Sequence, residues 1–215
     1  MSSYSSQDRP SVARFTPLSM QEILYPAQML AQQHIEAEKE EDHWRWTHNQ
    51  RDYETLVVVY NDFTPEEGSY DYIVKMKGHK WPLMRDIGTI FPVDEYEYIA
   101  CVDDDLITDC GSFNAGLELA NAFNFQYWQL SMPPNSDLHP SYRNCLQQDL
   151  SCTFSETTFI EMGSPFFKRE RFLFLVDFLK HFELKIAWGI DKTFYDLFQC
   201  PSHVVHCATI HQPIS

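Results

Sequence analysis

The sequence has no long apolar run, no excess of basic residues and no internal repeat. Without a stretch of about 18 apolar residues, no segment is expected to span a membrane. The 16 lysines and arginines are outnumbered by 31 aspartates and glutamates, which gives a formal net charge of −15. This balance argues against a nucleic acid or an anionic membrane as the main partner. It leaves a phosphorylated small molecule open, because a bound divalent metal can reverse the local field.

Cysteine pairs of the Cys-x-x-Cys type are also missing. The six cysteines stand at positions 101, 110, 145, 152, 200 and 207. Cys101 and Cys207 fall in apolar runs, where a free thiol behaves as a small buried hydrophobe. We therefore expect reduced, unbridged cysteines. The first eight residues have neither the basic nor the apolar segment of a secretory signal, and a cytoplasmic protein is expected.

Length and composition favour one globular domain preceded by an arm. With 215 residues, 44% of them apolar and 15% aromatic, the chain is long enough for one well-buried domain and too short for two. Residues 1–50 are predicted to form an N-terminal arm and a helix over residues 20–46, which a Ser-x-x-Glu capping pattern at Ser19 begins. Residues 51–215 are predicted to form the single folded domain.

Strand and helix patterns alternate within this domain. Strands are predicted over residues 55–60, 70–76, 98–102, 125–130, 157–162 and 203–213. Helices are predicted over residues 82–91, 112–124, 164–182 and 191–198. The first strand reads as central and the strand over 125–130 as half-buried, while Ser112, Ser164 and Asp191 are expected helix N-caps. Alternation of this kind predicts an α/β fold.

The most informative stretch is the apolar run over residues 98–102, which ends in Asp103, Asp104 and Asp105. Such a run predicts a buried parallel strand, and open α/β sheets bind ligands where such strands end. If the strand continues through the acids, Asp103 and Asp105 lie on one side and Asp104 on the other. Two carboxylates on one side can bind Mg²⁺ or Mn²⁺, and these ions also coordinate phosphate oxygens. The alternative is that the acids cap the next helix or solvate a turn.

Five segments in a fixed order carry a resemblance to a known family. They are residues 77–82 (KGHKWP), 96–106 (YEYIACVDDDL), 159–165 (FIEMGSP), 188–191 (WGID) and 210–213 (IHQP). Together they resemble a family of GT-A-type glycosyltransferase-like proteins, known in plants and bacteria mostly as an uncharacterised domain and similar to a glycosyltransferase domain of large algal viruses. The resemblance covers about residues 50–215 and implies a GT-A (Rossmann-like) fold, with a mixed, mainly parallel sheet flanked by helices.

The resemblance also implies a metal site. Enzymes of this type bind a nucleotide sugar through an Asp-x-Asp carboxylate and a divalent metal, often with a C-terminal histidine. On this chain the metal ligands would be Asp103, Asp105 and His211, with Asp105 the direct ligand and Asp103 on the metal or the ribose. The cofactor would be Mn²⁺ or Mg²⁺ and the donor a UDP- or GDP-linked sugar. His211 alone would more often be a structural histidine.

A rival metal site is a zinc cluster built from the C-terminal cysteines and histidines. It would use Cys200, His203, His206, Cys207 and His211. Strand alternation sends His203 and His206 to opposite faces, and the spacing matches no known zinc motif.

Nucleotide contacts are expected at the end of the first strand and in the helix after residue 80. Tyr60, Asn61 and Asp62 are placed to meet the nucleoside, with Asp62 able to accept a hydrogen bond from the base. Lys80 is expected to reach a phosphate or the base as a point charge, and Arg85 is a second cation one turn on. Asp104, between the two metal acids, joins this binding set. The plain alternative for Lys80 is a solvated loop residue.

Two carboxylates are candidates for the general base that activates the acceptor hydroxyl. Asp191 is favoured, because inverting GT-A enzymes place a carboxylate at a comparable strand-to-helix junction; its other role is to cap the following helix. Glu161 is the second candidate, with a solvent-facing strand end as its alternative.

The resulting hypothesis is an inverting, metal-dependent glycosyltransferase that moves a sugar from a nucleoside-diphosphate sugar to a hydroxyl acceptor such as a glycan. One alternative is a phosphohydrolase of the haloacid dehalogenase type, which also uses Asp-x-Asp after a strand. That pattern requires a small residue and then Thr or Val after the second acid, and a later pair of acids; here Leu106 and Ile107 follow, and no such pair is evident. The other alternative is a catalytically inactive sugar-nucleotide-binding module.

Overall fold

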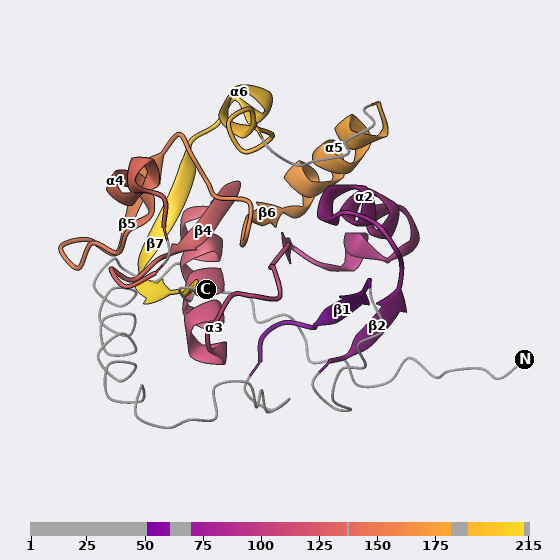
Figure 1. Cartoon of the computed structure of the whole chain (residues 1–215), viewed down its shortest axis with the longest axis horizontal. Coiled ribbons are helices and arrows are strands. Elements are labelled where there is room, and N and C mark those ends of the chain that lie inside the picture. Colours follow the sequence, from indigo (N-terminus) through magenta and orange to yellow (C-terminus); the bar gives the residue numbers. More distant parts are fainter. Residues whose placement is uncertain (1–50, 61–69, 137, 182–188, 213–215) are drawn as a thin grey trace, which may run out of the picture.

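The computed structural model describes residues 51–60, 70–136, 138–181 and 189–212, and Figure 1 shows how their helices and strands are arranged. The helix predicted over residues 20–46 lies outside the described residues. Asn61 and Asp62, two of the predicted nucleoside contacts, also lie outside them.

Two sheets are present in the described part of the chain. A two-stranded sheet pairs β1 (Leu56–Val59) with β2 (Tyr72–Lys75) in parallel. A five-stranded sheet has the order β3 (Tyr98–Ala100), β6 (Phe166–Lys168), β4 (Tyr127–Ser131), β7 (Ser202–Thr209) and β5 (Phe154–Thr157). β1 is therefore half of a separate pair, and the prediction that it is a central strand is wrong. Its β-branched run nevertheless forms a strand, as predicted.

The five-stranded sheet is mixed and mostly antiparallel. β6 is antiparallel to both β3 and β4, β5 is antiparallel to β7, and only β4 and β7 run parallel. The α/β class is confirmed, but the Rossmann-like, mainly parallel sheet is wrong. The reason lies in β6, a short strand that returns between β3 and β4. Its residues follow Ser164 and Pro165, which mimic the start of a helix.

Helices cover the sheet and one another (Figure 1). They are α2 (Lys80–Ile90), α3 (Cys110–Phe123), α4 (Arg143–Leu146), α5 (Arg169–Lys180) and α6 (Phe194–Phe198), with 3-10 turns at Val93–Glu95 and Pro140–Tyr142. α3 packs against β4 and β7, while α2 packs against α5. Among the described residues, no helix combines the length and the apolar character needed to cross a membrane.

Two of the predicted helix starts are displaced by side-chain and tertiary contacts. α3 is capped by Asp109, which accepts from both the backbone nitrogen and the hydroxyl of Ser112 at 2.9 and 2.7 Å. Ser112, the predicted cap, therefore lies inside the helix. The helix predicted to start at Ser164 starts instead at Arg169, because residues 166–168 pair as a strand. The prediction of a strand over residues 157–162 is wrong, because β5 covers Phe154–Thr157 and no strand follows it up to residue 162.

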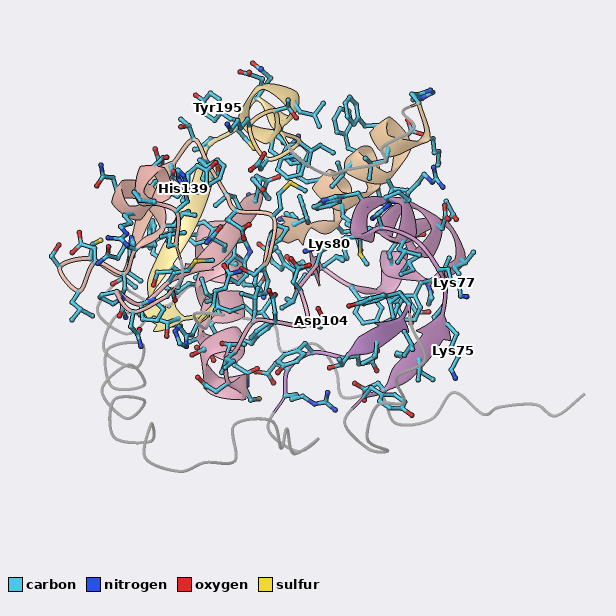
Figure 2. The ribbon with its side chains drawn as sticks, viewed as in Figure 1. Lys75, Lys77, Lys80, Asp104, His139 and Tyr195 are labelled. Carbon is cyan, nitrogen blue, oxygen red and sulfur yellow. The ribbon has the colours of Figure 1, made fainter. Side chains whose placement is uncertain are left out.

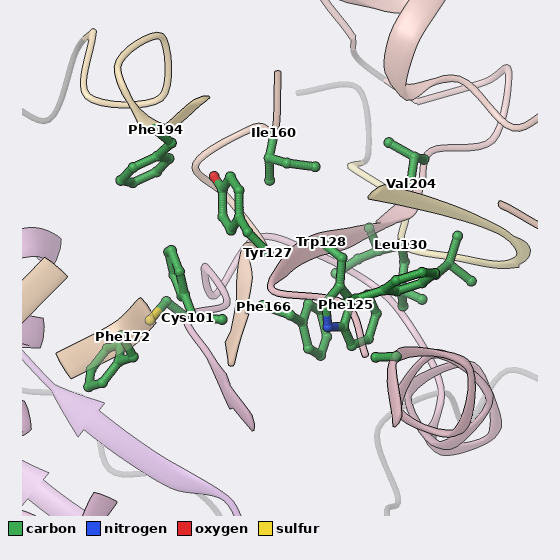
Figure 3. Close-up of a cluster of buried hydrophobic side chains, with 14 of the residues drawn as sticks. Cys101, Phe125, Tyr127, Trp128, Leu130, Ile160, Phe166, Phe172, Phe194 and Val204 are labelled. Carbon is green, nitrogen blue, oxygen red and sulfur yellow. The ribbon is translucent and has the colours of Figure 1, made fainter. Parts of the chain in front are cut away.

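The core is built around β4. All five of its residues are buried, so the prediction of a half-buried strand is wrong. Trp128 stacks on Phe166 with ring centroids 4.0 Å apart, and Tyr127 stacks on Phe167 at 4.9 Å. A Cβ at Gly116 on α3 would come within 2.7 Å of the Trp128 ring, so only glycine lets α3 approach this closely. Figure 3 shows this cluster, with the Tyr127 ring turned away from Trp128.

Candidate functional site

None of the three consecutive acids lies on a strand, and Asp104 and Asp105 form a turn. β3 ends at Ala100, is antiparallel to β6 and occupies the edge of the sheet, so the prediction of a buried parallel strand running into the acids is wrong. Two backbone hydrogen bonds continue past the strand end, from Cys101 to the Pro165 carbonyl at 2.9 Å and from Asp103 to the Gly163 carbonyl at 2.7 Å. Because the turn at Asp104 and Asp105 follows these bonds, strand alternation does not extend through the three acids and does not decide which of them faces the site.

Asp103 is held by a lysine. Lys80, the first residue of α2, places its Nζ 2.7 Å from Oδ1 of Asp103. The same ammonium donates to the carbonyls of Met162 at 2.5 Å and Gly163 at 3.1 Å. Burial raises the pKa of the Asp103 carboxyl, an effect that Lys80 opposes and the charge of Asp105 reinforces. The predicted alternative of a solvated lysine does not apply, because the Lys80 side chain is only 19% exposed.

The next two acids have different surroundings. Oδ2 of Asp104 accepts a hydrogen bond from the Tyr60 hydroxyl at 2.9 Å, and this bond raises the pKa of the tyrosine. Tyr60 is 48% exposed at the end of β1. Asp105 is exposed, and no hydrogen bond or ion pair of its carboxylate occurs among the described residues. Of the three carboxylates, Asp105 is thus the one without a partner in the part of the chain that the structure describes.

Glu161 lies on the segment that Lys80 binds. Its Oε2 accepts a hydrogen bond from the Gly163 nitrogen at 2.5 Å, and its own backbone nitrogen donates to Oε1 of the buried Gln129 at 2.7 Å. Burial is the main reason why the pKa of Glu161 is raised. The Gly163 nitrogen and Lys80 lower it, while the charges of Asp103 and Asp191 raise it further. Glu161 therefore shares one electrostatic neighbourhood with the other acids and does not face solvent as a free strand end.

Asp191 comes from the C-terminal part of the chain. α6 begins at Phe194 with Thr193 as N-cap, so the prediction that Asp191 caps this helix is wrong. Its Oδ1 accepts instead from the backbone nitrogen of Lys192 at 2.9 Å. The side chain is half-buried, and its charge contributes to the raised pKa values of Glu161 and Tyr127.

Tyr127 is a site residue that the sequence did not single out. Its hydroxyl is buried, and no hydrogen-bond partner for it occurs within the described part of the chain. Figure 3 shows the oxygen pointing between Ile160 and Phe194. Ile160 directly precedes Glu161 in the sequence, and Phe194 follows Asp191 by three residues. Burial, followed by the charges of Asp191 and Glu161, raises the pKa of this hydroxyl well above its usual range. A buried hydroxyl without a partner in the described part of the chain, within electrostatic reach of two acids, is a hydrogen-bonding group available to a ligand.

Backbone pairing places His211 beside Ile107, close in sequence to the three acids. It forms an antiparallel bridge with Ile107, with hydrogen bonds of 2.8 and 2.7 Å, which brings the C-terminal segment beside the chain just after Asp105. Its Nε2 lies 3.4 Å from the Asn135 carbonyl. Among the described residues, no three His, Cys, Asp or Glu side chains are grouped so as to hold a metal. The predicted set of Asp103, Asp105 and His211 is therefore not assembled as a three-ligand shell.

The Nε of Arg85 pairs with Oδ1 of the neighbouring Asp86 at 2.7 Å. Two residues of the rival zinc cluster also have structural partners. His206 accepts from the Asp149 nitrogen at 3.1 Å and pairs with the Ser155 hydroxyl at 2.8 Å. His203 stacks on Phe125 with ring centroids 4.0 Å apart.

Comparisons with known proteins leave the function open. No protein-family model matches the chain, and no curated protein matches it. Among solved structures, the crystal structure of A197 from STIV is similar, with a TM-score of 0.49 and 14% sequence identity over 76% of this chain and 87% of that chain. A likeness of this size carries no information about function.

Proposed function

We propose that the protein is a metal-dependent, GT-A-type glycosyltransferase, which transfers a sugar from a nucleoside-diphosphate sugar to a hydroxyl acceptor. One observation carries the proposal: Glu161 lies within electrostatic reach of both Asp103 and Asp191, which come from two other segments of the chain. The charges of Glu161 and Asp191 also act on the buried hydroxyl of Tyr127, for which no hydrogen-bond partner occurs among the described residues. Raised pKa values of acids, as burial gives to Asp103 and Glu161, together with a buried unsatisfied polar atom favour a catalytic site over a structural one.

The two candidate bases have distinct surroundings. Glu161 is tied to Gly163, and burial raises its pKa, which makes it a stronger base when ionised. Asp191 is half-buried and bound through its side chain only to the neighbouring Lys192 nitrogen. An acceptor hydroxyl needs direct contact with the base, so the less constrained Asp191 is proposed as the base. Glu161 is proposed to be a positioning residue, which holds the neighbouring groups through its charge and its hydrogen bond from the Gly163 nitrogen.

The residues fit a metal that is bound mainly by its nucleotide. Mg²⁺ and Mn²⁺ commonly use one or two carboxylates together with substrate phosphates and water, instead of a closed protein shell. The exposed carboxylate of Asp105 would hold such an ion, and His211 lies on the neighbouring segment. When bound, the metal would supply positive charge to the leaving nucleoside diphosphate. The exposed Tyr60, next to Asp104, is proposed to contact the nucleoside.

The activity test is a donor panel assayed for release of nucleoside diphosphate. The full chain is incubated with UDP- and GDP-linked sugars and Mn²⁺, with and without simple sugar acceptors. We expect release from at least one donor and a loss of at least 100-fold in Asp191→Asn, a typical size for a general base. Asp196→Asn, which changes an exposed acid on α6, should keep the activity.

The same assay separates the alternatives. Release of inorganic phosphate from phosphate esters, without any nucleotide response, would support the phosphohydrolase and contradict the transferase. Binding of nucleotide sugars without release of nucleoside diphosphate would support an inactive binding module.

A further inference from the structure

We propose that Lys80 is a built-in cation for Asp103, so that the Asp103 carboxylate is neutralised by this lysine and is not a metal ligand. This inference deepens the proposed function, on which it rests in taking Asp105 as the carboxylate that meets a divalent metal. It replaces the sequence-based assignment of Asp103 to the metal. It also replaces the assignment of Lys80 to a phosphate.

The geometry of the ammonium carries the first step. Lys80 Nζ lies 2.7 Å from Asp103 Oδ1, 2.5 Å from the Met162 carbonyl and 3.1 Å from the Gly163 carbonyl. A lysine ammonium has three N–H donors, and three protein acceptors surround this one. No donor is left over for a phosphate. One carboxylate and two carbonyls are also oxygen ligands of the kind that a hard cation prefers, so the ammonium fills a cation position.

The start of the helix that carries Lys80 is anchored in the core. It begins α2, and the next residue, Trp81, is fully buried. The Trp81 ring packs edge-on against Phe167 and Phe194, with centroids 6.4 and 5.9 Å away. Lys80 therefore enters the site from an anchored helix start, and its side chain is mostly covered. A charge placed in this way is screened little by water.

The contacts of Lys80 connect the acid turn with the Glu161 segment. The Gly163 carbonyl accepts from both Lys80 and the Asp103 nitrogen, while the Gly163 nitrogen donates to Glu161. A Cβ at Gly163 would come within 2.6 Å of Glu161 Oε2, which shows how closely these groups pack. A divalent ion on Asp103 would meet the lysine charge at the same carboxylate, and like charges at this separation repel strongly.

Two nearby lysines provide a comparison. Lys75 and Lys77 are exposed, and Figure 2 shows them at the outer flank of the molecule, whereas Lys80 lies toward its middle. Lys77→Met removes the same unit of charge as Lys80→Met from a chain whose formal charge is −15. It is therefore the matched control for a general electrostatic effect on cation binding.

The test is calorimetric titration of the full chain with Mn²⁺ alone. We expect Lys80→Met to bind Mn²⁺ at least tenfold more tightly than Lys77→Met, because Asp103 loses its resident cation. The double variant Lys80→Met with Asp103→Asn should lose that gain. An affinity of Lys80→Met no higher than that of Lys77→Met would overturn the proposal.

A second variant keeps the test decisive if Lys80→Met fails to fold, as judged by far-ultraviolet circular dichroism. Asp103→Asn, in a chain that keeps Lys80, should change Mn²⁺ affinity by less than twofold, whereas a tenfold loss would make Asp103 a ligand and overturn the proposal. Nucleotide is absent from both titrations. Failure to bind any nucleoside diphosphate would therefore count against the proposed function and leave the result on Lys80 standing.

Discussion

The Tyr60 hydroxyl donates a hydrogen bond of 2.9 Å to Oδ2 of Asp104, and this contact distinguishes one acid from its two neighbours. Asp103 is bound by Lys80, and Asp105 is exposed without a partner among the described residues. Three identical side chains in a row thus have three different environments. Their roles follow from these contacts and not from strand alternation.

Replacement of Asp105 is expected to have the largest effect among the three acids on metal-dependent nucleotide binding. Asp105→Ala removes the carboxylate that is open to a cation, so the increase in melting temperature caused by UDP or GDP with Mn²⁺ should disappear. Asp104→Ala removes a carboxylate that Tyr60 already occupies and should reduce the increase less. Thermal shift measurements on the two variants decide between these acids, and the reverse order would contradict the assignment.

Removal of the Tyr127 hydroxyl is expected not to destabilise the protein. The Tyr127 hydroxyl is buried and has no hydrogen-bond partner among the described residues. Burial of such a group lowers the free energy of unfolding by about 1–3 kcal/mol. Tyr127→Phe should therefore leave the free energy of unfolding unchanged or raise it by up to about that amount. Urea denaturation measures this quantity. If the variant lowers the free energy of unfolding by more than about 1 kcal/mol, the usual net contribution of a hydrogen bond, the hydroxyl has a structural partner.

Glu161 predicts a pH dependence with a definite sign. Burial raises its pKa in the folded state above the unfolded value. The associated stability is therefore fully present below the unfolded pKa and is lost as the pH rises through the folded pKa. Glu161→Gln does not titrate, so it should become more stable relative to wild type as the pH rises through this window.

Denaturation curves at several pH values measure the relative stability of Glu161→Gln. Glu156→Gln, which removes an exposed acid from β5, is the matched control. A difference between wild type and Glu161→Gln that does not change with pH would contradict the raised pKa.

Gly116 provides a prediction about the core beneath the site. A Cβ there would meet two atoms of the Trp128 ring at 2.7 and 2.8 Å. The ring is fully buried in the core and has little room to move. Gly116→Ala is expected to lower the free energy of unfolding by about 1–3 kcal/mol, as overpacking does. Gly189→Ala, where nothing lies within 4 Å, tests the alternative that any added methyl group is harmful, although its positive φ of 94° adds local backbone strain.

Local sequence patterns predicted several elements well because their signals lie within the element itself. The β-branched run at Leu56–Val59 forms β1, and the closing run at Ser202–Thr209 forms β7. The apolar spacing between Phe113 and Phe123 falls within α3. In each case hydrophobic periodicity and side-chain shape agree with the final environment.

Other features depend on contacts that no local pattern contains. Phe166 and Phe167 form β6 because β3 and β4 flank them, although Ser164 and Pro165 before them favour a helix. The acid turn is fixed by the Gly163 carbonyl, about 60 positions away in the chain, and by Lys80. Tyr127 alternates with polar residues like a surface strand, yet β4 is buried on both faces. Candidate acids could be found from sequence, whereas their partners could not.

Binding of a nucleoside diphosphate in the presence of Mn²⁺ tests the central claim most directly. Calorimetric titration of the full wild-type chain with UDP and with GDP, each with and without Mn²⁺, measures the affinity. The proposed function predicts that at least one of the two nucleotides binds, and that its affinity falls at least tenfold when Mn²⁺ is left out. Absence of binding by either nucleotide at millimolar concentration, with or without Mn²⁺, would contradict it.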